Sequence, residues 1–149
     1  MNAFVAAGAG FLLAVLWFDL MFDVQALRHR DGDLPDAVLA SIAGYYARVT
    51  TAARPMNRLI AAAMLATLAA VIVEIAAGDA RAWVAWASLA LALGAISIAA
   101  VSTVPKAVRL GRRMDAPGIQ SRLARAILRD HLVCFPAIAA VLVLQLATV

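Results

Sequence analysis

The chain has 149 residues, of which 65% are hydrophobic and 15% are charged, and its mean hydropathy is +0.90. This composition lies well outside the range of soluble domains. The net charge of +4 is therefore interpreted as a signal of membrane topology and of contact with anionic lipid headgroups, with no nucleic-acid partner expected. The sequence predicts an all-α, polytopic membrane protein.

Four windows of the sequence contain no charged residue: 1–18, 59–73, 82–105 and 132–149. A helix rises ~1.5 Å per residue, so a hydrocarbon layer of roughly 30 Å needs about 20 residues. With their polar flanks, the windows predict four spanning helices in one membrane domain of residues 1–149. The predicted spans are residues 2–23, 57–78, 82–105 and 129–148.

The first predicted helix ends in the run WFDLMFD, which places Asp19 and Asp23 one turn apart. No basic residue precedes its apolar stretch, so we interpret it as a retained spanning helix and not as a signal peptide. Counted from Asn2, Asp19 lies roughly 26 Å along the helix, close to the inner edge of the hydrocarbon. Gly8 and Gly10 lack the context of a dinucleotide site and are interpreted as packing glycines.

A further helix is predicted in the first cytoplasmic loop, over residues 34–53. Asp33 is its expected N-cap, and Asp36 lies in its first turn, where the helix dipole favours a carboxylate. This amphipathic helix is expected to lie on the inner leaflet or beneath the bundle. Apolar residues recur along it at helical spacing: Leu34, Val38, Ile42, Tyr45 and Val49.

The second and third spans are rich in alanine, as in AAAMLATLAA, and such small side chains favour close packing of a four-helix bundle. Pro55 is expected in the first turn of the second span. Glu74 is expected either to reach the outer interface near Arg81 or to face a neighbouring helix. In the fourth span, Pro136 interrupts the backbone hydrogen bonding and either kinks the helix or bends it without consequence.

Basic residues orient the predicted bundle. Five lie between the first and second windows and seven between the third and fourth, which makes twelve of the thirteen in the chain. Loops rich in Lys and Arg stay in the cytoplasm, so a multi-pass protein of the cell membrane with both termini outside the cytoplasm is predicted. Its expected partners are anionic headgroups of the inner leaflet and, as an option, further copies of the chain.

The predicted inner rim collects charged and polar side chains from several helices: Asp19, Asp23, Arg54, Asn57, Arg58, Lys106, Arg109, Arg129, Asp130 and His131. In one interpretation, which we favour, Asp19 and Asp23 pair with Arg58, Lys106 or Arg129 and close the bundle. In the other, the same groups line a pocket open to the cytoplasm, with carboxylates as proton acceptors and His131 as a shuttle. The sequence assigns none of them a catalytic role.

Metal binding by Asp19 and Asp23, with His131 or Asp130 as a third ligand, is disfavoured because the nearby arginines compete for the carboxylates. No haem, flavin or nucleotide motif is recognised, and no cofactor is expected. The single cysteine, Cys134, excludes an intrachain disulfide.

The segments VPKAVRL and LRDHLVCF, which end the third span and begin the fourth, resemble those of small four-helix membrane proteins of the anthrone-oxygenase-like family. The resemblance covers the second half of the chain. It implies a four-helix architecture and, as an alternative function, oxygenase chemistry without a cofactor. Lys106 and Ala107 replace the expected asparagine, and no tryptophan precedes Arg129, so the activity is not carried over.

Three classes of function follow from the sequence. An accessory or interaction role is favoured because no catalytic motif is recognised. A small transporter or channel subunit would have to act as an oligomer, because ionisable groups near the membrane midplane are scarce. A membrane enzyme acting on a lipophilic substrate would need a cavity at the inner rim.

Overall fold

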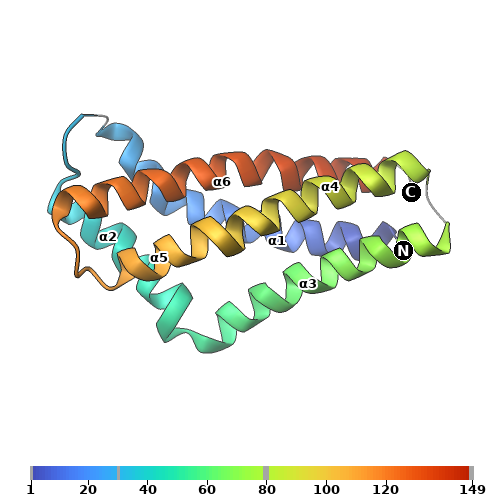
Figure 1. The fold of residues 1–149 in the computed structure, drawn as a ribbon, viewed down its shortest axis with the longest axis horizontal. Coiled ribbons are helices and arrows are strands. Elements are labelled where there is room, and N and C mark those ends of the chain that lie inside the picture. The colour runs from blue at the N-terminus through green and yellow to red at the C-terminus, as the bar shows by residue number, and fades with distance from the viewer. Residues whose placement is uncertain (1, 30, 79–80, 148–149) are drawn as a thin grey trace.

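The computed structural model describes residues 2–29, 31–78 and 81–147, and every regular element within these ranges is helical (Figure 1). The α-helices are α1 (Asn2–Asp23), α2 (Asp36–Ala47), α3 (Arg54–Ala77), α4 (Ala82–Ile98), α5 (Val104–Gly111) and α6 (Pro117–Leu146). They are joined by a 3-10 segment, η1 (Val24–Arg28), and by two π-helical segments, η2 (Arg48–Ala52) and η3 (Ala99–Thr103). Four continuous helical stretches are long and apolar enough to cross a membrane: Asn2–Arg28, Pro55–Ala77, Ala82–Gly111 and Pro117–Leu146.

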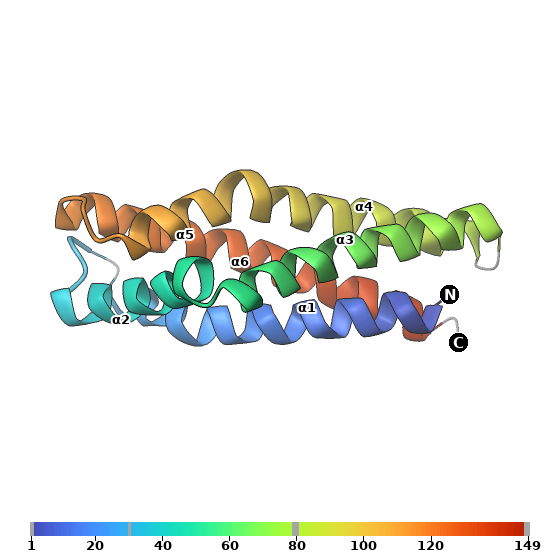
Figure 2. The same ribbon diagram turned by 90° about the horizontal axis from the view of Figure 1, so that it is seen from below.

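The four long stretches form a bundle in which each packs against two neighbours. Helix α1 lies between α6 and α3, and α4 closes the ring by contacting α3 and α6. The start of α1, the end of α6 and the facing ends of α3 and α4 lie at one end of the bundle, and α2 and the α5–α6 connection lie at the other, called here the inner end (Figures 1 and 2). Gly8 of α1 lies so close to α3 that a Cβ there would be 2.2 Å from Thr67 Oγ1, which confirms it as a packing glycine. The same interpretation is wrong for Gly10, where a Cβ would meet nothing within 4 Å.

The inner end is closed by α2, which packs against α5 and also contacts α6 and α1. Leu39, Ile42 and Tyr46 of α2 are buried in this contact. The helix begins later than predicted, because Pro35 and not Asp33 precedes its first turn and no side chain caps it. Asp36 occupies the first turn as expected and pairs with Arg113 of the α5–α6 connection.

The third and fourth long helices continue beyond the predicted spans. The helix that contains span 82–105 ends at Gly111, and the helix that contains span 129–148 begins at Pro117. The predicted spans stop close to the basic residues that flank the uncharged windows. Arginine and lysine are good helix formers, however, so the helices continue through the basic segments. A 30-residue helix is about 45 Å long, which exceeds a hydrocarbon layer of roughly 30 Å. Helix α6 also runs through Pro136 as one element.

Both π-helical segments precede a proline. Segment η2 is followed by Pro55 in the first turn of α3, and η3 by Pro105 in the first turn of α5. Proline cannot donate a backbone hydrogen bond and clashes with the preceding helical turn, so in the continuous helix Ala82–Gly111 the widened turn of η3 relieves the conflict at Pro105. Segment η2 is instead followed by Ala53, whose backbone is not helical and separates it from α3. The wide turn between α4 and α5 is visible in Figure 2. After η2, the start of α3 diverges from α5 in Figure 1, and the pocket described below lies beside it.

Candidate functional site

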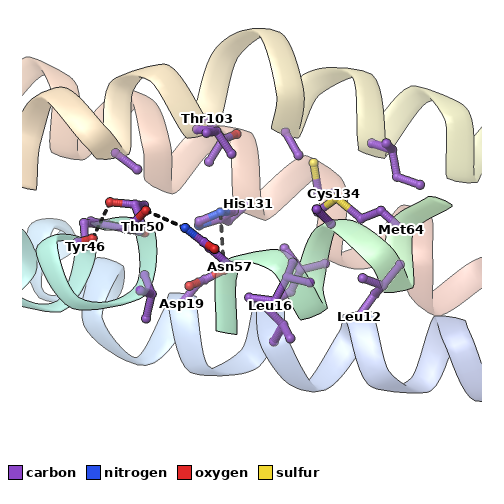
Figure 3. Close-up of a pocket in the computed structure, with 18 of the residues that line it drawn as sticks. Leu12, Leu16, Asp19, Tyr46, Thr50, Asn57, Met64, Thr103, His131 and Cys134 are labelled. Atoms are coloured by element: carbon purple, nitrogen blue, oxygen red, sulfur yellow. Dashed lines mark hydrogen bonds and ion pairs between the residues drawn. The ribbon is translucent and has the colours of Figure 1, made fainter. Parts of the chain in front are cut away.

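A pocket of about 440 Å³ lies among α1, the α2–η2 segment, α3, the α4–η3–α5 segment and α6 (Figure 3). Most of its wall is aliphatic and comes from α1, α3, α4 and α6, as Leu12, Leu16 and Met64 illustrate. Its polar groups come mainly from the turns nearest the inner end: Asp19, Tyr45, Tyr46, Thr50, Asn57, Arg58, Thr103 and His131. The pocket is therefore apolar over most of its wall, with polar groups gathered toward one end.

His131 is oriented by a fully buried carboxylate. Its Nδ1 lies 2.6 Å from Oδ2 of Asp23, the last residue of α1, and Tyr46 OH donates to Asp23 Oδ1 at 2.8 Å. A carboxylate only accepts hydrogen bonds, so the proton of this contact belongs to Nδ1 of the imidazole. That arrangement fixes the ring and leaves Nε2 as the atom that can accept or give a proton.

Asp19 lies on the other side of the same imidazole. Tyr45 OH donates to Asp19 Oδ1 at 2.7 Å, while Asp19 Oδ2 lies 3.7 Å from His131 Nε2. This second separation is too long for a hydrogen bond. Because both residues line the pocket, Oδ2 and Nε2 can together bind a polar group of a ligand that both donates and accepts.

The two tyrosines act as fixed hydrogen-bond donors. Burial, followed by the nearby charge of Asp19, raises the pKa of Tyr45 far above its usual value. Burial and then the charge of Asp23 raise the pKa of Tyr46 in the same direction. Both phenols therefore keep their protons at neutral pH. The ring of Tyr45 is also stacked on Phe22, with centroids 4.2 Å apart, which restricts its position.

The partners predicted for Asp19 and Asp23 are wrong. Arg58 and Arg129 are exposed, and Lys106 binds a different carboxylate, Asp130, at 3.0 Å. Asp130 and His131 are adjacent, so their side chains point about 100° apart around α6 and meet different helices. The predicted ring is thus divided into an Asp19–Asp23–His131 cluster and an Asp130–Lys106 cluster.

The π-helical segment η3 explains the second cluster. It places two consecutive hydroxyls on one carboxylate, with Ser102 Oγ at 2.7 Å and Thr103 Oγ1 at 3.2 Å from Asp130 Oδ2. Lys106 Nζ also donates to Ser102 Oγ at 2.5 Å. Oδ2 of Asp130 therefore joins α6 to the α4–α5 segment, and Asp130 lies outside the pocket lining.

The remaining predicted residues are scattered. Asn57 and Arg58 line the pocket, and Asn57 Nδ2 donates to the Thr50 carbonyl at 2.9 Å. Arg109 points elsewhere and forms a two-bond pair with Asp115. Arg54 begins α3, but its side chain lies outside the described part of the structure.

The predicted set of polar residues omits Tyr45, Tyr46 and Thr50, which line the pocket. The sequence pattern places Tyr45 in an apolar stripe, but a tyrosine in such a stripe carries a hydroxyl that needs a partner when it is buried. That requirement, together with two carboxylates predicted at the same level, is the signal that could have linked the tyrosines to the aspartates.

Glu74 lies near the opposite end of the bundle and faces neighbouring helices, one of its two predicted placements. It is fully buried, and Gln145 Nε2 of α6 lies 3.4 Å from its Oε1 and 3.2 Å from Ser88 Oγ of α4. These polar groups do not line the pocket.

The chain matches no protein-family model, no curated protein and no solved structure. The chemistry of the pocket residues is therefore the basis for assigning a function. Within the described residues, no group of three or more His, Cys, Asp or Glu side chains is arranged to hold a metal ion. The pocket does present an imidazole fixed by one carboxylate and facing another, which is an arrangement suited to proton transfer.

Proposed function

We propose that this protein is a multi-pass membrane enzyme that binds the polar group of a lipophilic molecule in the pocket and transfers a proton to or from a carbon atom next to that group. One observation carries the proposal: His131 is held by the buried Asp23 and presents Nε2 toward Asp19 at the polar end of an otherwise apolar pocket. The anthrone-oxygenase-like resemblance belongs to the same general class, with a lipophilic substrate and no cofactor.

The shape and lining of the pocket favour a lipophile over a water-soluble metabolite. A volume of about 440 Å³ falls within the range of sites for small molecules, which are mostly apolar with a few placed polar groups. An apolar body would lie along Leu12, Leu16 and Met64, and a hydroxyl, enol or carbonyl would lie between Asp19 and His131. Entry from the membrane would spare such a molecule exposure to water.

In the proposed reaction, His131 Nε2 takes a proton from the substrate or returns one to it. Asp23 is a positioning residue, because it keeps Nδ1 protonated and stabilises the imidazolium that forms. Asp19 holds the polar group of the substrate, and Tyr45 fixes the Asp19 carboxylate by its hydrogen bond. We rank this function above an accessory role, because an oriented acid–base pair in a pocket has a direct use in catalysis.

The orientation predicted from the basic residues is part of the proposal. Of the basic residues that the structure describes, only Arg81 belongs to the end of the bundle that holds the chain ends, whereas seven others lie on α5, on the first half of α6 and in the connection between them. We place the inner end in the cytoplasm and both termini outside it, in the cell membrane.

Binding can be tested by native mass spectrometry of purified protein with a chloroform–methanol lipid extract of the expression-host membranes. The pocket variant is Ala61→Phe, because Ala61 lines the pocket at an exposed position of α3, and the control is the neighbouring exposed Ala62→Phe. We expect wild type and the Ala62 variant to retain a common lipophile and the Ala61 variant to lose it. Equal retention by all three proteins would exclude this pocket as the binding site.

Proton transfer can be tested on the same complex in deuterated water. We expect the bound lipophile to gain deuterium at carbon in wild type and to gain none with His131→Gln, although both proteins retain it. A retained lipophile whose isotope content does not depend on His131 would leave the pocket as a binding site and contradict the enzymatic function.

A further inference from the structure

A second hollow, of about 470 Å³, lies between α5 and α6 near the inner end. Four arginines surround an aliphatic floor, which suits a ligand with both anionic and apolar parts. The arginines and the two larger floor residues are Arg109, Arg122, Arg125, Arg129, Ile119 and Leu123. We call this hollow the arginine groove.

Two of the four arginines are already engaged. Arg109 forms a two-bond pair with Asp115, at 2.8 and 2.7 Å, and this neighbour holds the pKa of Asp115 below its usual value. Arg125 donates to the carbonyls of His29 and Gly32, at 2.9 and 2.7 Å. Both guanidinium groups are thereby fixed in place beside the groove.

The other two arginines hold uncompensated charge. Arg122 and Arg129 are exposed, and neither has an ion pair or hydrogen bond with another side chain in the part of the chain that the structure describes. No acidic residue belongs to the lining of the groove. An arginine presents a planar set of donors that matches phosphate oxygens in pairs, so two such groups form a strong site for a phosphate.

The direction of the groove matches that of a lipid. Arg122, Arg125 and Arg129 follow one face of α6 at spacings of three and four residues and extend over about 10 Å. Arg129 precedes Asp130 and His131, at the level where the apolar part of α6 begins, and Arg122 lies toward the inner end. A headgroup among the arginines would therefore have its acyl chains directed along the apolar part of α6.

We propose that the arginine groove binds the phosphate headgroup of an anionic phospholipid from the inner leaflet. Basic pockets between helices on the cytoplasmic side of membrane proteins suit such headgroups. A free phosphate ion would satisfy the arginines equally, but it would leave the aliphatic floor of Ile119 and Leu123 without a role. The site is separate from the His131 pocket, so it does not depend on the enzymatic function.

The test measures binding of dioleoyl phosphatidylglycerol and dioleoyl phosphatidylcholine to the full chain in neutral detergent, by native mass spectrometry. The groove variant is Arg122→Gln/Arg129→Gln. The control, Arg48→Gln/Arg112→Gln, removes the same charge from exposed arginines outside the groove. We expect wild type and the control to prefer phosphatidylglycerol, and the groove variant to bind it about 10-fold to 30-fold more weakly.

Equal weakening in both double variants would overturn the proposal, because net charge alone would then explain the binding. Equal affinity of wild type for the two lipids would overturn it as well. A third arm adds inorganic phosphate at millimolar concentration. Displacement of phosphatidylglycerol by phosphate would identify a free-anion site and contradict a lipid site, whereas retention of the lipid supports the proposal.

Discussion

Asp23 shows how the cluster satisfies a buried carboxylate without a permanent cation. Its side chain is fully buried, and it accepts hydrogen bonds from a phenol and from an imidazole. A buried charge without partners is very unfavourable. Removing one of the two hydrogen-bond donors would leave the buried carboxylate only partly compensated. Tyr46 and His131 therefore contribute to stability as well as to the proposed chemistry.

Replacing Asp23 with Asn should destabilise the protein, because the amide cannot accept strongly from both neighbours. We expect a loss of about 2 to 3 kcal/mol in the free energy of unfolding, against about 1 kcal/mol for Tyr46→Phe. The measurement is denaturant unfolding in detergent. In the double variant, the loss in the free energy of unfolding should be smaller than the sum of the two single losses. Strict additivity would show that the two groups do not interact.

Cys134 provides a natural reporter for the pocket. It is nearly buried, its thiol lies 3.6 Å from the Ala95 carbonyl, and it lines the same pocket as His131. We expect N-ethylmaleimide to alkylate wild type slowly, and Ala61→Phe to slow alkylation several-fold further by filling the pocket. Mass spectrometry gives the rate, with Ala62→Phe as the control. An unchanged rate with Ala61→Phe would mean that the reagent reaches Cys134 by another route.

At the scale of elements, the contact between α2 and α5 holds the tyrosines in place. The loop helix α2 carries Tyr45 and Tyr46, and its partner α5 approaches it through a residue without a side chain. A Cβ on Gly111 would lie 2.9 Å from the backbone nitrogen of Ala47. The backbone cannot yield as a flexible side chain would, so this close approach requires glycine.

Gly111→Ala should therefore separate α2 from α5. We expect a loss of about 1 to 3 kcal/mol in the free energy of unfolding and faster proteolysis near α2. Gly44→Ala is the matched control, because Gly44 also lies in a helix of the inner end but a Cβ there would meet nothing within 4 Å. Alanine at position 44 should be neutral or stabilising. Equal effects of the two substitutions would show that the close approach of Gly111 to Ala47 does not contribute to the free energy of unfolding.

At the scale of the whole molecule, the two ends of the bundle carry different groups of polar and charged side chains. The end with the chain termini carries the buried Glu74 group, and the inner end carries the pocket's polar groups and the arginine groove. Both proposed sites thus lie toward the same end of the bundle, which the proposed orientation places on the cytoplasmic side of the membrane. A substrate and an anionic lipid would approach the protein from one leaflet.

The orientation can be tested with single cysteines in a Cys134→Ala background. Asp31→Cys and Gly118→Cys belong to the inner end, and Arg81→Cys belongs to the opposite end. We expect a membrane-impermeant maleimide to label position 81 in intact cells, and positions 31 and 118 only after the inner face is opened. The reverse pattern would invert the proposed orientation.

The sequence by itself determined the helical architecture, because uncharged windows of sufficient length and the absence of strand signals leave few alternatives. It also determined that Asp19, Asp23 and His131 belong to the same level, because residues counted along helices of known rise have known depths. The predicted spans do not give the ends of the helices, since Lys and Arg mark the limit of an apolar window and not the limit of a helix.

Only the tertiary structure decided which side chains meet. Asp130 and His131 are neighbours in sequence, yet one binds Lys106 and the other Asp23, because a single residue turns a helix by about 100°. The phenols that donate to Asp19 and Asp23 come from α2, and their contacts depend on how α2 packs against α5, for which no sequence pattern gives the angle. The pocket itself arises where α3 diverges after a π-helical turn, a feature of the whole bundle and not of any one segment.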